Sequence, residues 1–181
     1  MSTIKWALDA AHSELHFKVR HLVVSNVSGQ FKSFSATAET DGDNVTTAKV
    51  HFTAEVDSIS TNNEQRDGHL KTGDFFDAEN HPQIIFDAAG LTKVEGEHYQ
   101  MTGTLTMRGV SKSITVNVEY GGMIVDPWGH NRVGFAVSGK VNRKDFGVSF
   151  GMVSETGAIL LGEEVTFSAN VEFTQVIETA A

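Results

Sequence analysis

Arg66, Asp67 and His69 lie close together in the sequence, and their side chains could act together in catalysis or anion binding. An imidazole can transfer a proton near neutral pH, and a guanidinium can stabilise an anion. However, no G-x-S-x-G motif supplies a serine nucleophile, and the chain has no cysteine. We therefore expect Arg66 and Asp67 to tie a short helix to a loop through charge-assisted hydrogen bonds, and we predict no catalytic residue.

The eight histidines include a pair that could share a metal ion. His12 and His16 are four residues apart on or near one expected strand, so their side chains could lie on the same face. That face is the polar one of an alternating strand, and the sequence offers no third ligand of the kind that a closed site needs. Surface or turn positions are therefore expected for these histidines, and no metal site is predicted.

A second group of polar residues lies in the segment 142–147. Asn142 and Gly147 readily adopt the backbone angles of a turn, and Arg143 and Asp145 could form an ion pair within it. The expected role of this segment is structural.

Alternation of apolar and polar residues dominates the rest of the chain and predicts β-strands with one apolar face each. Several of these runs reach nine or more residues, whereas a strand usually has about five or six. Turns are indicated at Asp41–Asn44, at Glu95–Glu97 and at Arg108-Gly109, and another reversal by Gly121-Gly122 together with Asp126–Gly129.

Long strands with one apolar face need a shared interior, and closing the sheet into a barrel supplies it and removes the exposed edges. The sequence therefore predicts an all-β barrel in a single domain, residues 1–181. A barrel of about eight strands can be filled by its own side chains or can hold one slender ligand. The residues leave these alternatives open, although a ten-residue strand, about 33 Å long, suits an extended ligand.

Residues 62–71 break the alternation, and the capping-box spacing of Thr61 and Glu64 predicts a short helix there. Phe75 and Phe76 follow this helix and are expected to form an apolar gate. Because adjacent residues in an extended segment point in opposite directions, one of the two rings is expected to reach the interior.

Composition excludes several classes of function. The formal net charge is −9 and no basic block stands out, so no nucleic-acid partner is predicted. No run of 18 apolar residues exists, so no transmembrane segment is predicted. The N-terminus has no apolar signal region, which predicts a cytoplasmic location; the periplasm is the alternative if a leader has been removed.

Several motifs, in order along nearly the whole chain, resemble those of YceI-like proteins. They are Trp6-x-Leu8-Asp9-x-x-His12-Ser13, Arg66-Asp67-x-His69-Leu70-Lys71, His81-Pro82-x-Ile84-x-Phe86, Gly103-x-Leu105-x-Met107-Arg108-Gly109 and Asn142-Arg143-x-Asp145-Phe146-Gly147. The resemblance implies an extended, eight-stranded antiparallel, lipocalin-like β-barrel with a helical insertion. It also implies a bacterial protein that binds a polyisoprenoid, an isoprenoid quinone or a fatty-acid-like molecule in the pore, in isoprenoid transport or storage or in stress response.

The main functional prediction is thus a carrier of a long-chain lipid, with no other cofactor, and not an enzyme. The predicted pore residues are Leu15, Phe17, Val19, Val50, Phe52, Phe75, Phe76, Ile84, Phe86, Met101, Leu105, Phe135 and Phe167. Head-group contacts are predicted for Arg66, His69 and Arg143, because cationic donors suit a phosphate or quinone oxygen.

Two alternatives remain open from the sequence. The first is an enzyme that acts on a lipidic or small substrate with Arg66, His69 and Asp145 near one barrel mouth. The second is a filled barrel that serves as an interaction module. The family resemblance is also compatible with a homodimer, which no residue by itself demands.

Overall fold

The computed structural model describes residues 2–21, 25–150 and 161–177. Within these ranges, twelve strands form one antiparallel sheet, accompanied by one α-helix and three short 3₁₀ helices. The elements are β1 (Thr3–Leu8), η1 (Ala10–His12), β2 (Glu14–His21), β3 (Ser25–Phe31), β4 (Phe34–Asp41), β5 (Asn44–Glu55), η2 (Val56–Ser58), β6 (Ile59–Ser60), α1 (Glu64–Leu70), β7 (Gln83–Ala89), β8 (Thr92–Glu95), β9 (His98–Met107), β10 (Val110–Val125), β11 (Asn131–Asn142), η3 (Arg143–Phe146) and β12 (Leu161–Gln175).

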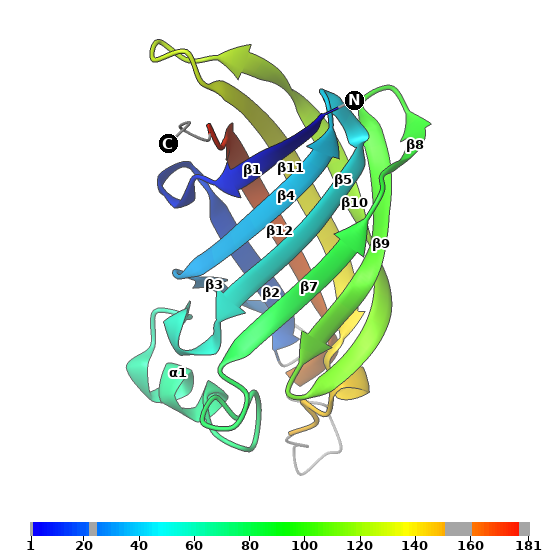
Figure 1. Cartoon of the computed structure of the whole chain (residues 1–181). Helices are drawn as coiled ribbons and strands as arrows, with labels where there is room; N and C mark the ends of the chain where they lie inside the picture. The colour runs from blue at the N-terminus through cyan, green and yellow to red at the C-terminus, as the bar shows by residue number, and fades with distance from the viewer. Residues whose placement is uncertain (1, 22–24, 151–160, 178–181) are drawn as a thin grey trace.

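The barrel has eight strand positions. Four of these positions hold a bent strand made of two consecutive segments: β1 with β2, β3 with β4, β5 with β6, and β7 with β8. β1 and β2 pair with successive parts of β12, and β4 and β3 pair in turn with β1 and β2. In the same way, β5 pairs with β4 and β6 pairs with β3, while β7 and β8 both pair with β9. Since β1 bonds to both β4 and β12, the sheet closes on itself (Figure 1). The predicted eight-stranded antiparallel barrel with a helical insertion is confirmed.

The alternating sequence explains which side of each strand faces the interior. In β4, for example, Ala36, Ala38 and Thr40 are buried, while the residues between them are exposed. Small side chains at these positions let the neighbouring strands curve closely around the interior.

Three predicted hairpins are confirmed, at Asp41–Asn44, Glu95–Glu97 and Arg108-Gly109. The predicted reversal after Tyr120 lies at residues 126–130, and Gly121-Gly122 does not contribute to it. These glycines lie inside β10, where the register with β11 shifts and Gly122 has φ +109°. They form a β-bulge, which bends a long strand without ending it.

The short helix is where the sequence placed it, but its cap is a different residue. Helix α1 spans Glu64–Leu70, and Asn63 is the N-cap, since its side chain accepts a hydrogen bond from the Arg66 N–H. Thr61, which the capping-box spacing suggested, instead bonds to side chains of the helix. No helix in the described part of the chain is long and apolar enough to cross a membrane.

The two ends of the barrel differ in construction (Figure 1). Helix α1, helix η3 and the β9–β10 turn lie at one end, which we call the α1 end. The β4–β5, β8–β9 and β10–β11 turns lie at the other, which we call the hairpin end. A buried cluster of Trp6, Ala36, Ala38, Val133 and Phe173 closes the interior near the hairpin end.

Candidate functional site

The barrel encloses a cavity of about 500 Å³. This volume lies within the range of about 300–1,000 Å³ that is usual for small-molecule sites. All but six of the residues that line it are apolar, and the six polar ones are His21, Thr40, Thr61, Arg66, His69 and Arg143. Such a lining excludes a strongly solvated ligand and suits one that is apolar along most of its length.

The predicted pore residues and the cavity coincide. All thirteen apolar residues that the sequence suggested line this cavity, and so do the three predicted head-group residues: Leu15, Phe17, Val19, Val50, Phe52, Phe75, Phe76, Ile84, Phe86, Met101, Leu105, Phe135, Phe167, Arg66, His69 and Arg143. The structure therefore brings together residues from β2, β5, β7, β9, β11, β12 and the region around α1.

Large inward side chains do not fill the interior. Phe17, Phe52, Phe86, Phe135 and Phe167 line the cavity, yet each keeps part of its surface accessible. In a close-packed core such rings would be almost completely buried. The filled barrel considered from the sequence is therefore not the structure of this protein.

A glycine on a neighbouring strand explains how a phenylalanine can leave the axis open. Phe167 lies opposite Gly139 in the β11–β12 register. A Cβ atom added to Gly139 would lie 2.6 Å from the Cζ atom of Phe167, which is too close for any side chain. The ring therefore lies flat against the wall, over the glycine. Phe17 covers Gly29 in the same manner.

Arg143 is a buried cation at the α1 end, with only 4% of its surface exposed. Its guanidinium donates hydrogen bonds to the backbone carbonyls of Val148, Phe150, Leu161 and Gly162. Burial lowers its pKa from the usual value. The expected ion pair with Asp145 is wrong, because the guanidinium points inward to these carbonyls while Asp145 is exposed. Arg143 thus holds the chain around η3 together and places a positive charge beside the cavity.

Arg66 and Asp67 tie α1 to the preceding strand, as the sequence suggested. The Arg66 Nε donates to the Thr61 hydroxyl and its NH2 group donates to the Thr61 carbonyl. Asp67 accepts from both the N–H and the hydroxyl of Thr61. These bonds do not use the NH1 group of Arg66, whose side chain lines the cavity from an exposed position.

His69 sits between a carboxylate and two aromatic rings. Its Nε2 lies 2.8 Å from the Asp74 Oδ2, and its ring makes T-shaped contacts with Phe75 and Phe150 at centroid distances of 5.0 Å. Asp145 does not line the cavity. Of the three residues that the enzyme alternative groups at one barrel mouth, Arg66 and His69 thus line the cavity and Asp145 is exposed outside it.

The segment that carries Phe75 and Phe76 is a series of hydrogen-bonded turns and not the extended chain that was expected. The N–H of Phe75 donates to Thr72 and that of Phe76 donates to Leu70. As a result both rings, and not one of the two, reach the cavity. They cover its α1 end from the side of the helix.

Arg108 also belongs to this end, a role that was not predicted from the sequence. Its guanidinium donates to the carbonyl of Gly73, after α1, and to that of Gly147, after η3. It thereby joins the two loops that surround the mouth. Its Nε is buried without a hydrogen-bond partner among the described residues. A hairpin arginine is usually exposed, so only the tertiary structure could identify this role.

At the hairpin end, Trp6 closes the cavity, and its indole N–H has a hydrogen-bond partner. The Trp6 Nε1 donates to the Thr40 hydroxyl, which donates in turn to the Gly42 carbonyl. Trp6 is only 3% exposed. This arrangement buries a large ring without leaving a buried donor unpaired.

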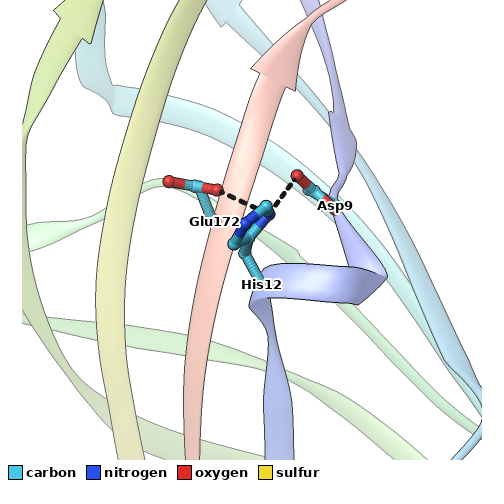
Figure 2. A group of neighbouring side chains, drawn as sticks. All are labelled: Asp9, His12 and Glu172. Atoms are coloured by element: carbon cyan, nitrogen blue, oxygen red, sulfur yellow. Dashed lines mark hydrogen bonds and ion pairs between the residues drawn. The ribbon is translucent and has the colours of Figure 1, made fainter. Parts of the chain in front are cut away.

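Outside the barrel, Asp9, His12 and Glu172 form a compact polar cluster (Figure 2). The His12 Nδ1 lies 2.7 Å from Asp9 Oδ2 and 3.5 Å from Glu172 Oε2. Arg132 donates from NH1 to both carboxylates, at 2.8 and 3.2 Å. The pKa of Asp9 is lowered by its hydrogen bonds with His12 and Arg132. The Arg132 guanidinium bonds to both acids, so His12, the two carboxylates and Arg132 form an ion-pair network.

The expectation that His12 and His16 share a strand face is wrong. His12 lies in η1, because the chain makes a short 3₁₀ turn between β1 and β2. His16 lies in β2 and is 3.2 Å from Glu14.

The fold and site together define a closed, eight-stranded antiparallel barrel with an apolar cavity whose charged lining groups gather at one end. Residues 6–173 match the model of the YceI-like domain, and the chain belongs to this family. A UPF0312 protein of Staphylococcus epidermidis is 39% identical over 170 residues, which cover 93% of this chain and 96% of the relative.

Solved structures show the same architecture. The YCEI protein of Campylobacter jejuni is 35% identical and superposes with a TM-score of 0.75, covering 89% of this chain and 91% of that one. A polyisoprenoid binding domain from Saccharophagus degradans superposes with a TM-score of 0.68 over 94% of this chain and 98% of that one. Its identity is 14%, so this second likeness concerns the fold alone.

Proposed function

We propose that this protein binds one long-chain amphiphilic lipid inside the barrel and acts as a carrier, not as an enzyme. The candidates are a polyisoprenoid, an isoprenoid quinone and a fatty-acid-like molecule. The observation that carries the proposal is the cavity wall, where inward phenylalanines pack against their neighbours on one side and keep part of their surface accessible on the side of the cavity. An apolar chain would remove that surface from water.

The energetics favour a ligand that is long and thin. Each CH₂ group transferred from water to an apolar site contributes about 0.8 kcal/mol, so a chain of ten such groups gains roughly 8 kcal/mol before the cost of ordering it. The cavity is lined by strands of one closed sheet, which keeps the reorganisation cost low. The polyisoprenoid named for the Saccharophagus degradans domain has this shape.

The charged groups suggest the direction in which the lipid lies. The head group would lie at the α1 end near Arg66 and His69, and the tail would extend towards Trp6 at the hairpin end. Arg66 retains its NH1 group as a donor, whereas the donors of Arg143 are bonded to backbone carbonyls. Arg143 would therefore act through its charge, which favours an anionic or strongly polar head group.

The direct test is to purify the protein from its native host, denature it and identify co-purifying lipids by mass spectrometry. The proposal expects one long-chain lipid per protein molecule. Replacing inward-facing Ala169 in β12 with phenylalanine should fill the lumen and reduce the bound lipid about tenfold or more. Ala136→Phe, on the exposed face of β11, is the matched control and should leave lipid binding unchanged.

Stability measurements separate a hollow barrel from a solid one. In a close-packed core, Ala169→Phe would overpack the interior and cost about 1–3 kcal/mol. In a hollow barrel the ring enters empty space, so the free energy of unfolding should change by less than about 1 kcal/mol. Unchanged lipid binding by Ala169→Phe would refute the proposed site.

Head-group contacts can be tested separately from tail binding. Arg66→Ala and His69→Ala should weaken binding of a prenyl phosphate several-fold and leave binding of the parent hydrocarbon unaffected. An equal loss for both ligands would show that these residues only maintain the fold of the α1 end.

A further inference from the structure

The β10–β11 hairpin extends past the rim of the barrel at the hairpin end (Figure 1). Ile124 and Val125, the last two residues of β10, are 64% and 65% exposed, and Trp128 in the turn is 77% exposed. Successive residues of a strand point to opposite faces. High exposure of both Ile124 and Val125 therefore means that the described part of the chain covers neither face of this tip.

The end of β12, beside the base of the hairpin, carries two further exposed apolar residues. β12 ends at Gln175, whose side-chain oxygen accepts a hydrogen bond of 2.7 Å from Asn131 at the base of the hairpin. Val176 and Ile177 follow immediately, and both are exposed. We call the five side chains the tip surface: Ile124, Val125, Trp128, Val176 and Ile177.

The turn that presents Trp128 is held firmly in place. Asp126 accepts hydrogen bonds from the N–H groups of Trp128 and His130, and Arg132 donates to its second oxygen at 2.8 Å. Arg132 is held in turn by Asp9 and Glu172, the carboxylates of Figure 2. A network of one buried and two half-buried carboxylates around Arg132 thus fixes a turn whose most exposed large side chain is a tryptophan.

Charge is almost absent from the tip itself. Between Met123 and Asn131 the ionisable residues are Asp126 and His130. The Asp126 side chain is only 4% exposed because it is directed into the network. The outer surface of the β10–β11 turn is therefore apolar and close to neutral, in a protein whose formal net charge is −9.

We propose that the tip surface docks onto an electrically neutral phospholipid bilayer, with Trp128 inserted at the level of the head groups. Tryptophan favours this interface because its ring is apolar and its N–H remains near water. The net charge of the protein opposes an anionic surface, whereas a zwitterionic one imposes no such repulsion. A second copy fits less well, since five side chains fall far short of the roughly 20–30 residues that each partner contributes to a stable interface.

Docking by the tip surface depends on the hairpin and not on the cavity. It can therefore be tested independently of the proposed lipid binding. A barrel docked in this way would be held at the membrane whether or not its cavity contained a lipid.

The experiment uses the full chain and vesicles of phosphatidylcholine, some of them carrying bromine on their acyl chains as a quencher. The chain has two tryptophans, and Trp6 is buried inside the barrel. On addition of vesicles, emission from Trp128 should shift to shorter wavelength and be quenched by the brominated lipid. Trp128→Phe should still bind vesicles, measured by flotation, but should lose the quenching, since only Trp6 then emits.

Trp128→Ser should reduce partitioning into these vesicles by about tenfold or more, because an aromatic side chain supplies a large part of the apolar area of so small a surface. Val94→Ser, at an exposed apolar site in β8, is the matched control and should partition like the wild type. Absence of quenching, or equal partitioning by Trp128→Ser, would overturn the proposal. So would a dimer in analytical ultracentrifugation that Trp128→Ser dissociates, which would assign the tip to a second copy.

Discussion

The two ends of the barrel place charge and apolar surface in opposite ways. At the α1 end, Arg66, His69 and Arg143 line the cavity while Phe75 is buried. At the hairpin end, Trp6 is buried within the barrel, the charges of Arg132 and its partners lie outside it, and the exposed side chains of the tip are apolar.

This contrast gives the barrel a direction. The α1 end can meet a polar head group from within the cavity, whereas the interior at the hairpin end offers only apolar contacts and the hydroxyl of Thr40, which Trp6 already occupies. A symmetric apolar tube would accept a chain in either orientation. The charges at one end alone favour one orientation over the other.

The largest effect is expected at the closed end. Trp6→Ala should lower the free energy of unfolding by about 3–5 kcal/mol, because it removes a buried aromatic side chain and leaves a cavity. Trp128→Ala should change it by less than about 0.5 kcal/mol, because the ring is exposed. Urea unfolding of both variants measures this difference. Similar losses of unfolding free energy in the two variants would contradict the conclusion that Trp6 supports the fold from inside the barrel while Trp128 is exposed outside it.

At the α1 end, Arg143→Met should cost about 3 kcal/mol, since it removes charged donors from four backbone carbonyls. Lys140→Met is the control, because Lys140 forms only an exposed ion pair with Glu164 at 3.7 Å. Thermal unfolding of the two variants should separate them clearly. A small effect of Arg143→Met would show that these carbonyls find other donors.

A smaller, more selective effect is expected along the wall. In Gly139→Ala the new Cβ should push the Phe167 ring towards the axis, destabilise the protein by about 1–3 kcal/mol and reduce binding of branched chains more than straight ones. Adding Phe167→Leu should restore both properties, and Ser138→Ala, on the outer face, should change neither. If the double variant recovers neither stability nor binding of branched chains, the Phe167 ring does not determine the width of the cavity.

The smallest effect concerns the base of the hairpin. The hydrogen bond from Arg132 is the main cause that lowers the pKa of Asp126 to about 2. An aspartate titrates near 3.9 in an unfolded chain, so the ionised carboxylate stabilises the fold above about pH 4. This stabilisation should fade as the pH falls from about 4 to about 2. The difference in Tm between wild type and Asp126→Asn should therefore shrink across that interval; a constant difference would contradict the assignment.

The strands, most of the hairpins and the eleven apolar lining residues that lie in strands could be predicted from the sequence, because alternation fixes which side chains share a face. In β12, for example, Phe167 and Ala169 must point to the same side whatever the neighbouring strands are. Closure of the barrel then places that side inward.

Residues whose partners are distant in the sequence could not be predicted in this way. Arg108 and Arg143 bond to backbone carbonyls, which every residue possesses, so no pattern of residue types announces the pairing. Arg132 joins Asp9, Asp126 and Glu172 from three parts of the chain. Gly121-Gly122 could form either a turn or a bulge, and only pairing with β11 decided between them.

Native mass spectrometry of the wild-type protein tests the central claim most directly. The protein would be incubated with vesicles that contain a polyprenyl lipid and then separated from them. A hollow, lipid-binding barrel predicts one added mass per protein molecule, strongly reduced in Ala169→Phe and retained in Ala136→Phe. A folded protein that never acquires a lipid, or one whose lipid is held equally by Ala169→Phe, would contradict the account.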